Sequence, residues 1–282
     1  MAYEKFIHEV WVNNIEKQLQ AKRVFVDGCS TEFDGLIKRK GDEVVMRSLG
    51  SPTVHKVLTS ASYDKIAAPE KLADSELRVK VDQLAYFNVC ISNIDEVQAD
   101  LPLFDEFAGR CADALAEDED KYAANLANDS SVTGIAVASL TAQNVYDYIL
   151  DATQKLREQN VPHDAELEAI VTPAMATRIK KAKVLTDTDN SDILRNGGIG
   201  KIDGVLIKES NNVAKDTATN KMDMVMVRVR KKACAFVEQI NKVIPYSPDD
   251  QLDTDALKGY VLYGAKVIRP KQMVVMKVTA YN

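Results

Sequence analysis

The chain is poor in the residues that build metal sites, disulfides and membrane spans. It has four cysteines, three histidines and one tryptophan among 282 residues. No run approaches the ~18 apolar residues of a membrane-spanning helix. Residues 1–6 have neither the basic nor the apolar region of a signal peptide. We therefore expect a protein that is made and kept in a cytoplasm.

The four cysteines are scattered. Cys29, Cys90, Cys111 and Cys234 form no C-x-x-C pair, which argues against a zinc knuckle or a thioredoxin-like redox site. Free cysteine is usually an interior residue, so we interpret all four as small buried hydrophobes. We expect no cofactor and no metal.

A net positive charge is also absent. The formal net charge is −6, and the basic residues cluster only at 38–40 and 228–232. This is the wrong sign for a protein that grips nucleic acid phosphates directly. If the protein meets DNA, we expect it to do so as an enclosing wall.

Residues 27–91 have strand-like sequence, but this stretch contains no apolar segment against which its strands could pack. Strand signals lie at 33–38, 43–49, 52–58, 76–82 and 84–91, with a charged Gly-Asp turn between the first two. Two-stranded ribbons are marginal in water by themselves. Such an excursion usually finds its stabilisation on another subunit, which indicates assembly and not catalysis.

Two helical patterns flank this excursion. Residues 1–26 have Trp11, Ile15 and Leu19 at helical spacing, which predicts an arm whose short amphipathic helix needs an outside surface. From Leu103 a helix of about 25 residues is expected. Its apolar stripe is Phe104, Phe107, Ala108, Cys111, Leu115, Tyr122 and Leu126.

Beyond residue 134 helices and strands alternate. Thr141 is the predicted cap of a helix that ends near residue 160, and Thr172 that of a helix which runs to about residue 183. Strands are expected at 167–171, 205–208 and 222–230, a polar loop at 186–204, and either helix or strand at 233–240. The segments 260–268 and 271–278 are expected to pair with each other through a turn at Arg269-Pro270.

Three constellations imitate functional sites. Residues 198–204 have glycines but not the spacing of a phosphate-binding loop, so we interpret them as a surface loop that turns into a strand. The carboxylates 117–120 splay around a helix, which favours a solvated face or a patch facing DNA. The acidic residues 187–192 lack the glycine and glutamate of a calcium loop.

The histidines complete the negative result. His8, His55 and His163 lie on three different predicted elements, and no G-x-S-x-G elbow exists. We name no catalytic, cofactor-binding or metal-binding residue, and we predict that the protein is not an enzyme.

In their order these elements resemble the tailed-phage major capsid protein of the Hong Kong 97-type coat fold. The likeness covers essentially the whole chain. Its most specific local sequence matches are Leu167–Pro173 before a helix, Asn196–Gly204 leading into Val205–Asn211, and the ending Tyr260–Pro270. The resemblance implies an α+β fold with an N-terminal arm (1–26), an extended β-loop (27–92), a spine helix of a peripheral domain (93–133), an axial α/β domain (134–259) and closing strands (260–282).

The resemblance also implies a function. The subunit would self-assemble into pentamers and hexamers that close an icosahedral shell around double-stranded DNA, in the virion and first in the host cytoplasm. Some members have a built-in scaffold of about a hundred N-terminal residues, which this chain lacks, so a separate scaffolding protein is implied, beside a portal and a decoration protein. Two alternatives stay open: an encapsulin-type nanocompartment shell and, more remotely, a nucleotide- or metal-dependent enzyme.

Overall fold

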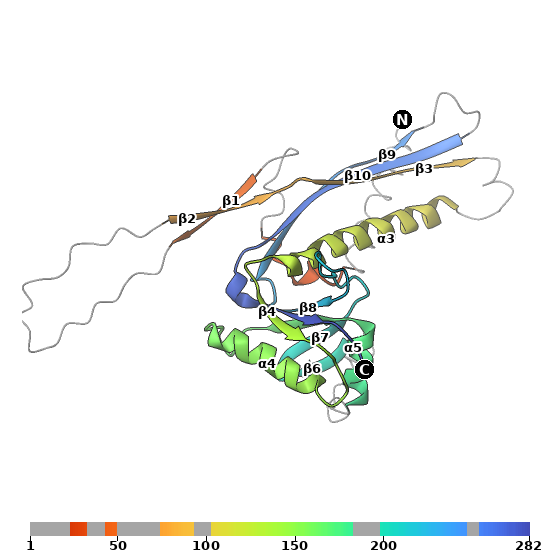
Figure 1. Ribbon diagram of the computed structural model, residues 1–282. Helices are drawn as coiled ribbons and strands as arrows, with labels where there is room; N and C mark the ends of the chain where they lie inside the picture. Colours follow the sequence, from red (N-terminus) through yellow and green to blue (C-terminus); the bar gives the residue numbers. More distant parts are fainter. Residues whose placement is uncertain (1–22, 33–42, 50–73, 93–102, 183–197, 247–253) are drawn as a thin grey trace, which may run out of the picture.

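The computed structural model of the chain describes residues 23–32, 43–49, 74–92, 103–182, 198–246 and 254–282. These residues form a six-stranded sheet with two helices, a three-stranded sheet with one long helix, and a two-stranded ribbon that projects away from both (Figure 1). The fold class is α+β, as the sequence predicted.

The six-stranded sheet holds the apolar strands of the chain. Its order is β4-β11-β8-β5-β7-β6, with the pairs β4/β11 and β5/β7 parallel and the others antiparallel. Every residue of β5 is buried, and so are all of β8 but the first. Continuous burial is typical of strands covered on both faces. The strand bounds are β4 Thr133–Val137, β5 Leu167–Val171, β6 Gly198–Ile202, β7 Val205–Glu209, β8 Asp223–Val229 and β11 Met273–Val278.

Two amphipathic helices accompany this sheet. Helix α4 (Val145–Glu158) packs against β11 and against α5 (Pro173–Lys181). Thr172 accepts a hydrogen bond from the backbone N–H of Met175 at 3.3 Å, which confirms the predicted cap of α5. The prediction for α4 was wrong by a few residues: the N-cap position is Asn144 and not Thr141, and the Asn144 side chain makes no capping hydrogen bond.

The three-stranded sheet is antiparallel, in the order β3-β10-β9, and the long helix α3 lies along it (Figure 1). Helix α3 has 22 residues and is therefore on the order of 33 Å long. None of the described helices combines the length and the apolar character needed to cross a bilayer. The bounds are β3 Gln83–Ser92, α3 Leu103–Ala124, β9 Cys234–Tyr246 and β10 Thr254–Val267, with short 3₁₀ turns η1 Val26–Gly28, η2 Asn125–Asn128 and η3 Pro270–Gln272.

The ribbon consists of β1 (Glu43–Leu49) and β2 (Asp74–Lys80), which, among the strands that the structure describes, pair only with each other. Where β2 leads into β3, the chain passes close to β10. A side chain at Gly264 would overlap the backbone of Lys80, so only glycine permits this crossing. The other predicted strands of the excursion, at 33–38 and 52–58, lie outside the described residues, as does most of the arm.

Two expectations about the end of the chain are corrected by the strand order. Residues 260–268 and 271–278 do not pair with each other: the first segment belongs to β10, beside β3 and β9, and the second to β11, between β4 and β8. The 3₁₀ turn η3 redirects the chain from one sheet to the other. Residues 233–240, for which the sequence left helix and strand open, enter strand β9.

Candidate assembly site and the N-terminal anchor

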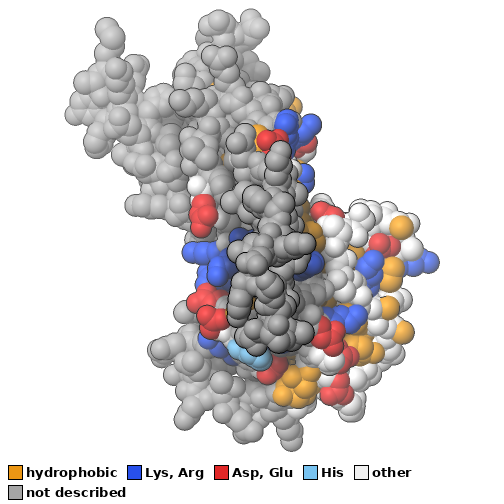
Figure 2. Space-filling view, turned by 90° about the vertical axis from the view of Figure 1, so that its left-hand side faces the viewer, with side chains coloured by type: hydrophobic (Ala, Val, Ile, Leu, Met, Phe, Trp, Pro, Cys, Tyr) orange, Lys and Arg blue, Asp and Glu red, His pale blue; other side chains and the backbone are white. Residues whose placement is uncertain are grey.

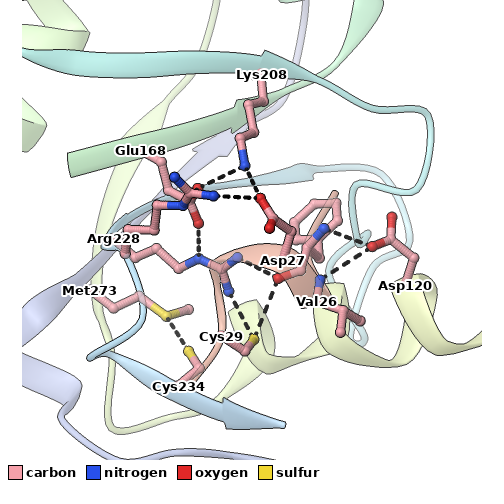
Figure 3. A network of polar contacts seen from close by, with 11 residues as sticks. Val26, Asp27, Cys29, Asp120, Glu168, Lys208, Arg228, Cys234 and Met273 are labelled. Carbon is pink, nitrogen blue, oxygen red and sulfur yellow. Dashed lines mark hydrogen bonds and ion pairs between the residues drawn. The ribbon is translucent and has the colours of Figure 1, made fainter. Parts of the chain in front are cut away.

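Residues 23–30, which we call the anchor segment, are inserted into the core of the subunit. Phe25, Val26 and Cys29 are buried. The backbone N–H groups of Phe25 and Val26 donate to one carboxylate oxygen of Asp120 at 2.6 and 3.4 Å (Figure 3). The side-chain amide of Asn212 donates to the other oxygen at 3.1 Å. The point from which the N-terminal arm departs is therefore held by α3.

A buried ion pair lies on the other side of the anchor segment. Glu168 in β5 and Arg228 in β8 are cross-strand neighbours. Both are fully buried, and Arg228 Nε donates to Glu168 at 2.8 Å. Arg228 also donates to the carbonyl oxygen of Phe25 and, at 3.3 Å, to the Cys29 sulfur (Figure 3). Sequence analysis missed this pair; its signal was two opposite charges in the middle of two apolar strands.

The outer end of this network reaches the surface. The second oxygen of Glu168 lies 3.2 Å from Lys208 Nζ and 3.8 Å from Arg230 Nε. Asp27 accepts hydrogen bonds from both Lys208 and Arg230 at 2.8 Å. Partial burial opposes ionisation of Asp27, but the Lys208 ammonium and the Arg230 guanidinium hold its pKa below the usual value. Two carboxylates and three cations thus meet around the anchor segment, with one positive charge in excess.

Gly28 allows the anchor segment to come this close. A Cβ atom at this position would overlap the carboxylate of Glu168 and the guanidinium of Arg228. Both of these side chains are held by the surrounding strands, so they have little room to give way. The ion pair and the glycine therefore fit as a unit.

The acidic residues of α3 correct an expectation. Glu117 and Asp118 are exposed, as predicted for a solvated face, but Glu119 and Asp120 are fully buried. Both side chains face the anchor segment. Asp120 accepts hydrogen bonds from its backbone N–H groups, and the Glu119 carboxyl lies 3.0 Å from Arg23. A carboxylate of an apparently polar run is buried here because the chain returns to meet it from about a hundred residues away.

Glu119 is also the most strongly perturbed carboxyl of the site. Burial, together with the neighbouring Glu238, raises its pKa to about 8, against the attraction of Arg23. The Glu119 carboxyl is therefore largely protonated at neutral pH. Arg23 also forms an ion pair with Glu238 of β9 and so links α3 to the three-stranded sheet.

The outer face of the three-stranded sheet carries apolar side chains in water. Along β3 the exposed and half-buried residues alternate. Tyr86 is 76% exposed and Leu84 is 43% exposed, and Tyr260 of β10 lies directly opposite Tyr86. A groove of about 340 Å³ separates β3 from α3. Its lining residues are Leu84, Ala85, Tyr86, Phe87, Cys111, Ala114, Leu115 and Asp118.

Charged side chains of both signs are mixed on one face of the molecule. Figure 2 shows Lys, Arg, Asp and Glu side chains interspersed over the described surface on this side of the molecule, without one continuous basic patch. That distribution agrees with the net charge of −6.

The constellations that imitate sites have other roles. Strand β6, the two-residue turn Asp203-Gly204 and β7 form a hairpin, and both turn residues have positive φ, as a type I′ turn requires. The expected loop is thus partly strand. Asp187–Asp192, His8 and His55 lie outside the described residues, and His163 is exposed. Among the residues that the structure describes, no three metal-ligating side chains lie together.

The cysteines correct a second expectation. Cys29, Cys111 and Cys234 are buried as predicted, but Cys90 is exposed on β3. It points to the same side of the sheet as Tyr86, because side chains alternate along a strand. The chain also brings together two cysteines that are far apart in sequence, since Ser30 and Ala235 form a parallel bridge.

Comparisons with known proteins agree with this geometry. Residues 87–276, about two thirds of the chain, match the family model described as phage capsid protein. A chain of Mycobacterium phage Che8 is 26% identical, with a TM-score of 0.72 over 90% of this chain and 91% of that one. No curated protein matches in sequence.

More distant structures share the fold alone. A chain from the capsid structure of cyanophage P-SCSP1u is 15% identical, with a TM-score of 0.72 over 92% of this chain and 88% of that one. A virus-like particle from Pyrococcus furiosus is 11% identical, with a TM-score of 0.61 over 96% and 99% of the two chains. The ribbon, the long helix and the mixed six-stranded sheet with its two helices are therefore those of the Hong Kong 97-type coat fold.

Proposed function

The chain belongs to the phage capsid protein family, as a major capsid protein of the icosahedral shell, and from this premise we propose that it assembles as pentamers and hexamers around double-stranded DNA. The β1–β2 ribbon carries this proposal. It pairs with no further strand among the described residues, yet it projects away from the two sheets (Figure 1). Ribbons of this kind are marginal in water unless another surface covers them.

The parts of the subunit receive roles under this proposal. The lobe built on the six-stranded sheet lines the capsomer axis, and the long helix with the three-stranded sheet forms the periphery. The ribbon of one subunit lies over its neighbour, where the exposed apolar face around Tyr86 is available to it. Head-to-tail contacts of this type close into rings. The shell contact, and not a reaction, is the activity of the protein.

Other components are part of the same proposal. Shell assembly takes place in the host cytoplasm with a separate scaffolding protein, and a portal and a decoration protein complete the particle. DNA is enclosed without sequence-specific contacts, as the acidic net charge favours. Co-expression of the chain with and without its scaffold, followed by electron microscopy, tests the scaffold requirement through the yield of closed particles.

A deletion tests the role of the ribbon. Replacing residues 39–78 by a short Gly/Ser turn should leave the rest of the subunit folded, because shortening a loop changes its closure entropy by only about 1–2 kcal/mol. Closed particles should disappear, since each subunit loses its reach to a neighbour. Circular dichroism and melting report the fold, and sedimentation velocity reports particles.

Two outcomes of the deletion would contradict the proposal in different ways. Normal shells from the shortened chain would exclude a role of the ribbon in holding neighbours together. Loss of the native circular dichroism would show that the ribbon belongs to the core of its own subunit.

A compartment that encloses protein is the second candidate, favoured by the match that covers 99% of the virus-like particle chain. The contents of purified particles decide between the two. Nuclease-protected double-stranded DNA in particles isolated from infected cells supports the capsid. A co-purified protein cargo without DNA supports the compartment.

A further inference from the structure

Cys29 and Cys234 are separated by about two hundred residues in sequence but are neighbours in the core. The backbone N–H of Ser30 donates to the Cys234 carbonyl at 2.8 Å, and that of Phe236 donates to the Ser30 carbonyl at 3.1 Å. These bonds place Ser30 opposite Ala235 in a parallel bridge. The residues just before the bridged pair, Cys29 and Cys234, therefore stand side by side with their side chains on one face.

This spacing suits a disulfide. Neighbouring strands lie about 4.7–4.9 Å apart. Disulfides join residues whose Cα atoms are about 4.4–6.8 Å apart. The two thiols are free in the structure, and both are buried. The bridge therefore holds the two backbone segments at a spacing that a disulfide can span.

The surroundings make the two sulfurs chemically different. A hydrogen bond from Cys234 and the charge of Arg228, 3.3 Å from the sulfur, lower the pKa of Cys29 to about 7, although burial and Glu168 oppose this. The pKa of Cys234 is raised by the same hydrogen bond and by burial. The remaining neighbours are uncharged: the Phe25 carbonyl oxygen lies 3.4 Å from the Cys29 sulfur, and the Met273 sulfur lies 3.7 Å from the Cys234 sulfur. One residue is thus the nucleophile, and the other keeps its proton.

We propose that Cys29 and Cys234 are an oxidative modification site, at which a peroxide converts the two thiols into a disulfide that ties the anchor segment to β9. In the first step the Cys29 thiolate attacks one oxygen of hydrogen peroxide, the O–O bond breaks, and sulfenic acid and hydroxide form. In the second step the Cys234 sulfur displaces hydroxide from the Cys29 sulfur, and its proton leaves with that hydroxide as water. Two thiols and one peroxide become one disulfide and two waters.

Such a bond would change what holds the N-terminal arm. In the reduced subunit the anchor segment is held by hydrogen bonds and ion pairs, which open and close. The disulfide would close a loop of about two hundred residues, and long loops gain most from a cross-link in the chain-entropy description. A shell that leaves a reducing cytoplasm would acquire this bond outside the cell. That setting rests on the proposed function, whereas the chemistry can be tested on the purified chain.

The test uses the full chain in a Cys90→Ser background, which removes the exposed thiol. Cys29, Cys111 and Cys234 remain. The purified, reduced protein is treated with hydrogen peroxide, both in buffer and in urea below the unfolding transition, where local opening admits the oxidant. Thiol titration after denaturation should fall from three to one. Peptide mapping without reductant should find residues 29 and 234 linked, and the melting temperature should rise by roughly 5 °C or more.

Matched variants separate this bond from other oxidation. Cys234→Ser and Cys29→Ser should each abolish the linked peptide and the melting shift, whereas Cys111→Ser should preserve both. Dithiothreitol should reverse the shift in the parent protein. The parent result does not depend on whether these variants fold, because peptide mapping reads the bond directly.

Three outcomes would overturn the proposal. One is Cys29 recovered as sulfinic acid while Cys234 stays a thiol. Another is a disulfide that joins either residue to Cys111. The third is unreacted Cys29 and Cys234 both in buffer and in urea below the transition. None of these outcomes bears on whether the chain forms a shell, which the ribbon deletion tests separately.

Discussion

The two sheets of this subunit bury their side chains in different ways. Strands β5, β8 and β11 of the six-stranded sheet are buried along nearly their whole length. Strand β3 of the three-stranded sheet alternates exposed and half-buried residues, and its outer face holds Tyr86 and Leu84 in water. The first sheet stabilises the subunit from within. The second sheet exposes apolar surface, which is typical of a face that another subunit covers.

The difference teaches where stability and assembly reside. Substitutions around the buried strands and the anchor segment should change the free energy of unfolding strongly. Substitutions on the outer face of β3 should barely change it, but they should change the yield of particles. Four predictions follow this gradient, from the largest effect on unfolding to the smallest.

Leu115→Asp should have the largest effect. Leu115 is 6% exposed on the core face of α3, and an unpaired carboxylate there costs several kcal/mol, comparable to a whole domain margin of about 5–15 kcal/mol. Insoluble or unfolded protein is expected. The control is Ala114→Asp, one residue away and exposed, which should remain folded. Soluble Leu115→Asp with unchanged melting would mean that the stripe is not part of the core.

Arg228→Met should come next. The change leaves Glu168 without its nearest cation and leaves the Phe25 carbonyl without its donor. Breaking a buried pair in this way costs about 3–5 kcal/mol. Urea unfolding followed by fluorescence measures the loss. Arg269→Met, at an exposed position, should change the unfolding free energy by less than about 0.5 kcal/mol, and equal losses in both variants would contradict the importance of the pair.

The pH dependence of stability should reveal Glu119. Its pKa is about 8 in the folded protein, above the 4.5 of an ordinary glutamate. The folded state therefore holds this proton more tightly than the unfolded chain does. The contribution of Glu119 to stability is fully present below about pH 4.5 and is lost as the pH rises towards about 8, by at most about 1.4 kcal/mol per pH unit.

Glu119→Gln supplies the comparison for this slope. The variant cannot titrate at this position, so its unfolding free energy should fall less steeply with pH than that of the parent protein. Asp120, whose pKa is also raised, chiefly by burial, is present in both proteins and cancels in the difference. Parallel curves from urea unfolding across this pH range would show that Glu119 titrates normally.

Tyr86→Ser should have the smallest effect on unfolding. The side chain is 76% exposed, so the unfolding free energy should change by less than about 0.5 kcal/mol. The yield of closed particles should nevertheless fall, because the change removes apolar area from the proposed contact surface. Tyr146→Ser on α4, another exposed tyrosine, serves as the control. Two results would contradict the contrast between the two sheets: a Tyr86→Ser variant that does not fold, or one whose particle yield equals that of the control.

Much of the fold could be predicted from local sequence. Residues 167–171 and 222–230 are apolar enough to be read as strands, Thr172-Pro173 marks the start of α5, and the stripe through Leu115 marks α3. The long polar excursion indicated assembly. These features depend on neighbours within a few residues, and for that reason periodicity and capping reveal them.

Tertiary structure alone decided the rest. Glu119 and Asp120 have the pattern of a solvated helix face, and they are buried because the anchor segment returns to them. Glu168 meets Arg228, and Cys29 meets Cys234, across sequence separations that no local pattern encodes. Likewise β10 and β11 are adjacent in sequence but lie in different sheets. Periodicity tells which face of an element is apolar, whereas the partner of each charge or thiol is set by how distant elements pack together.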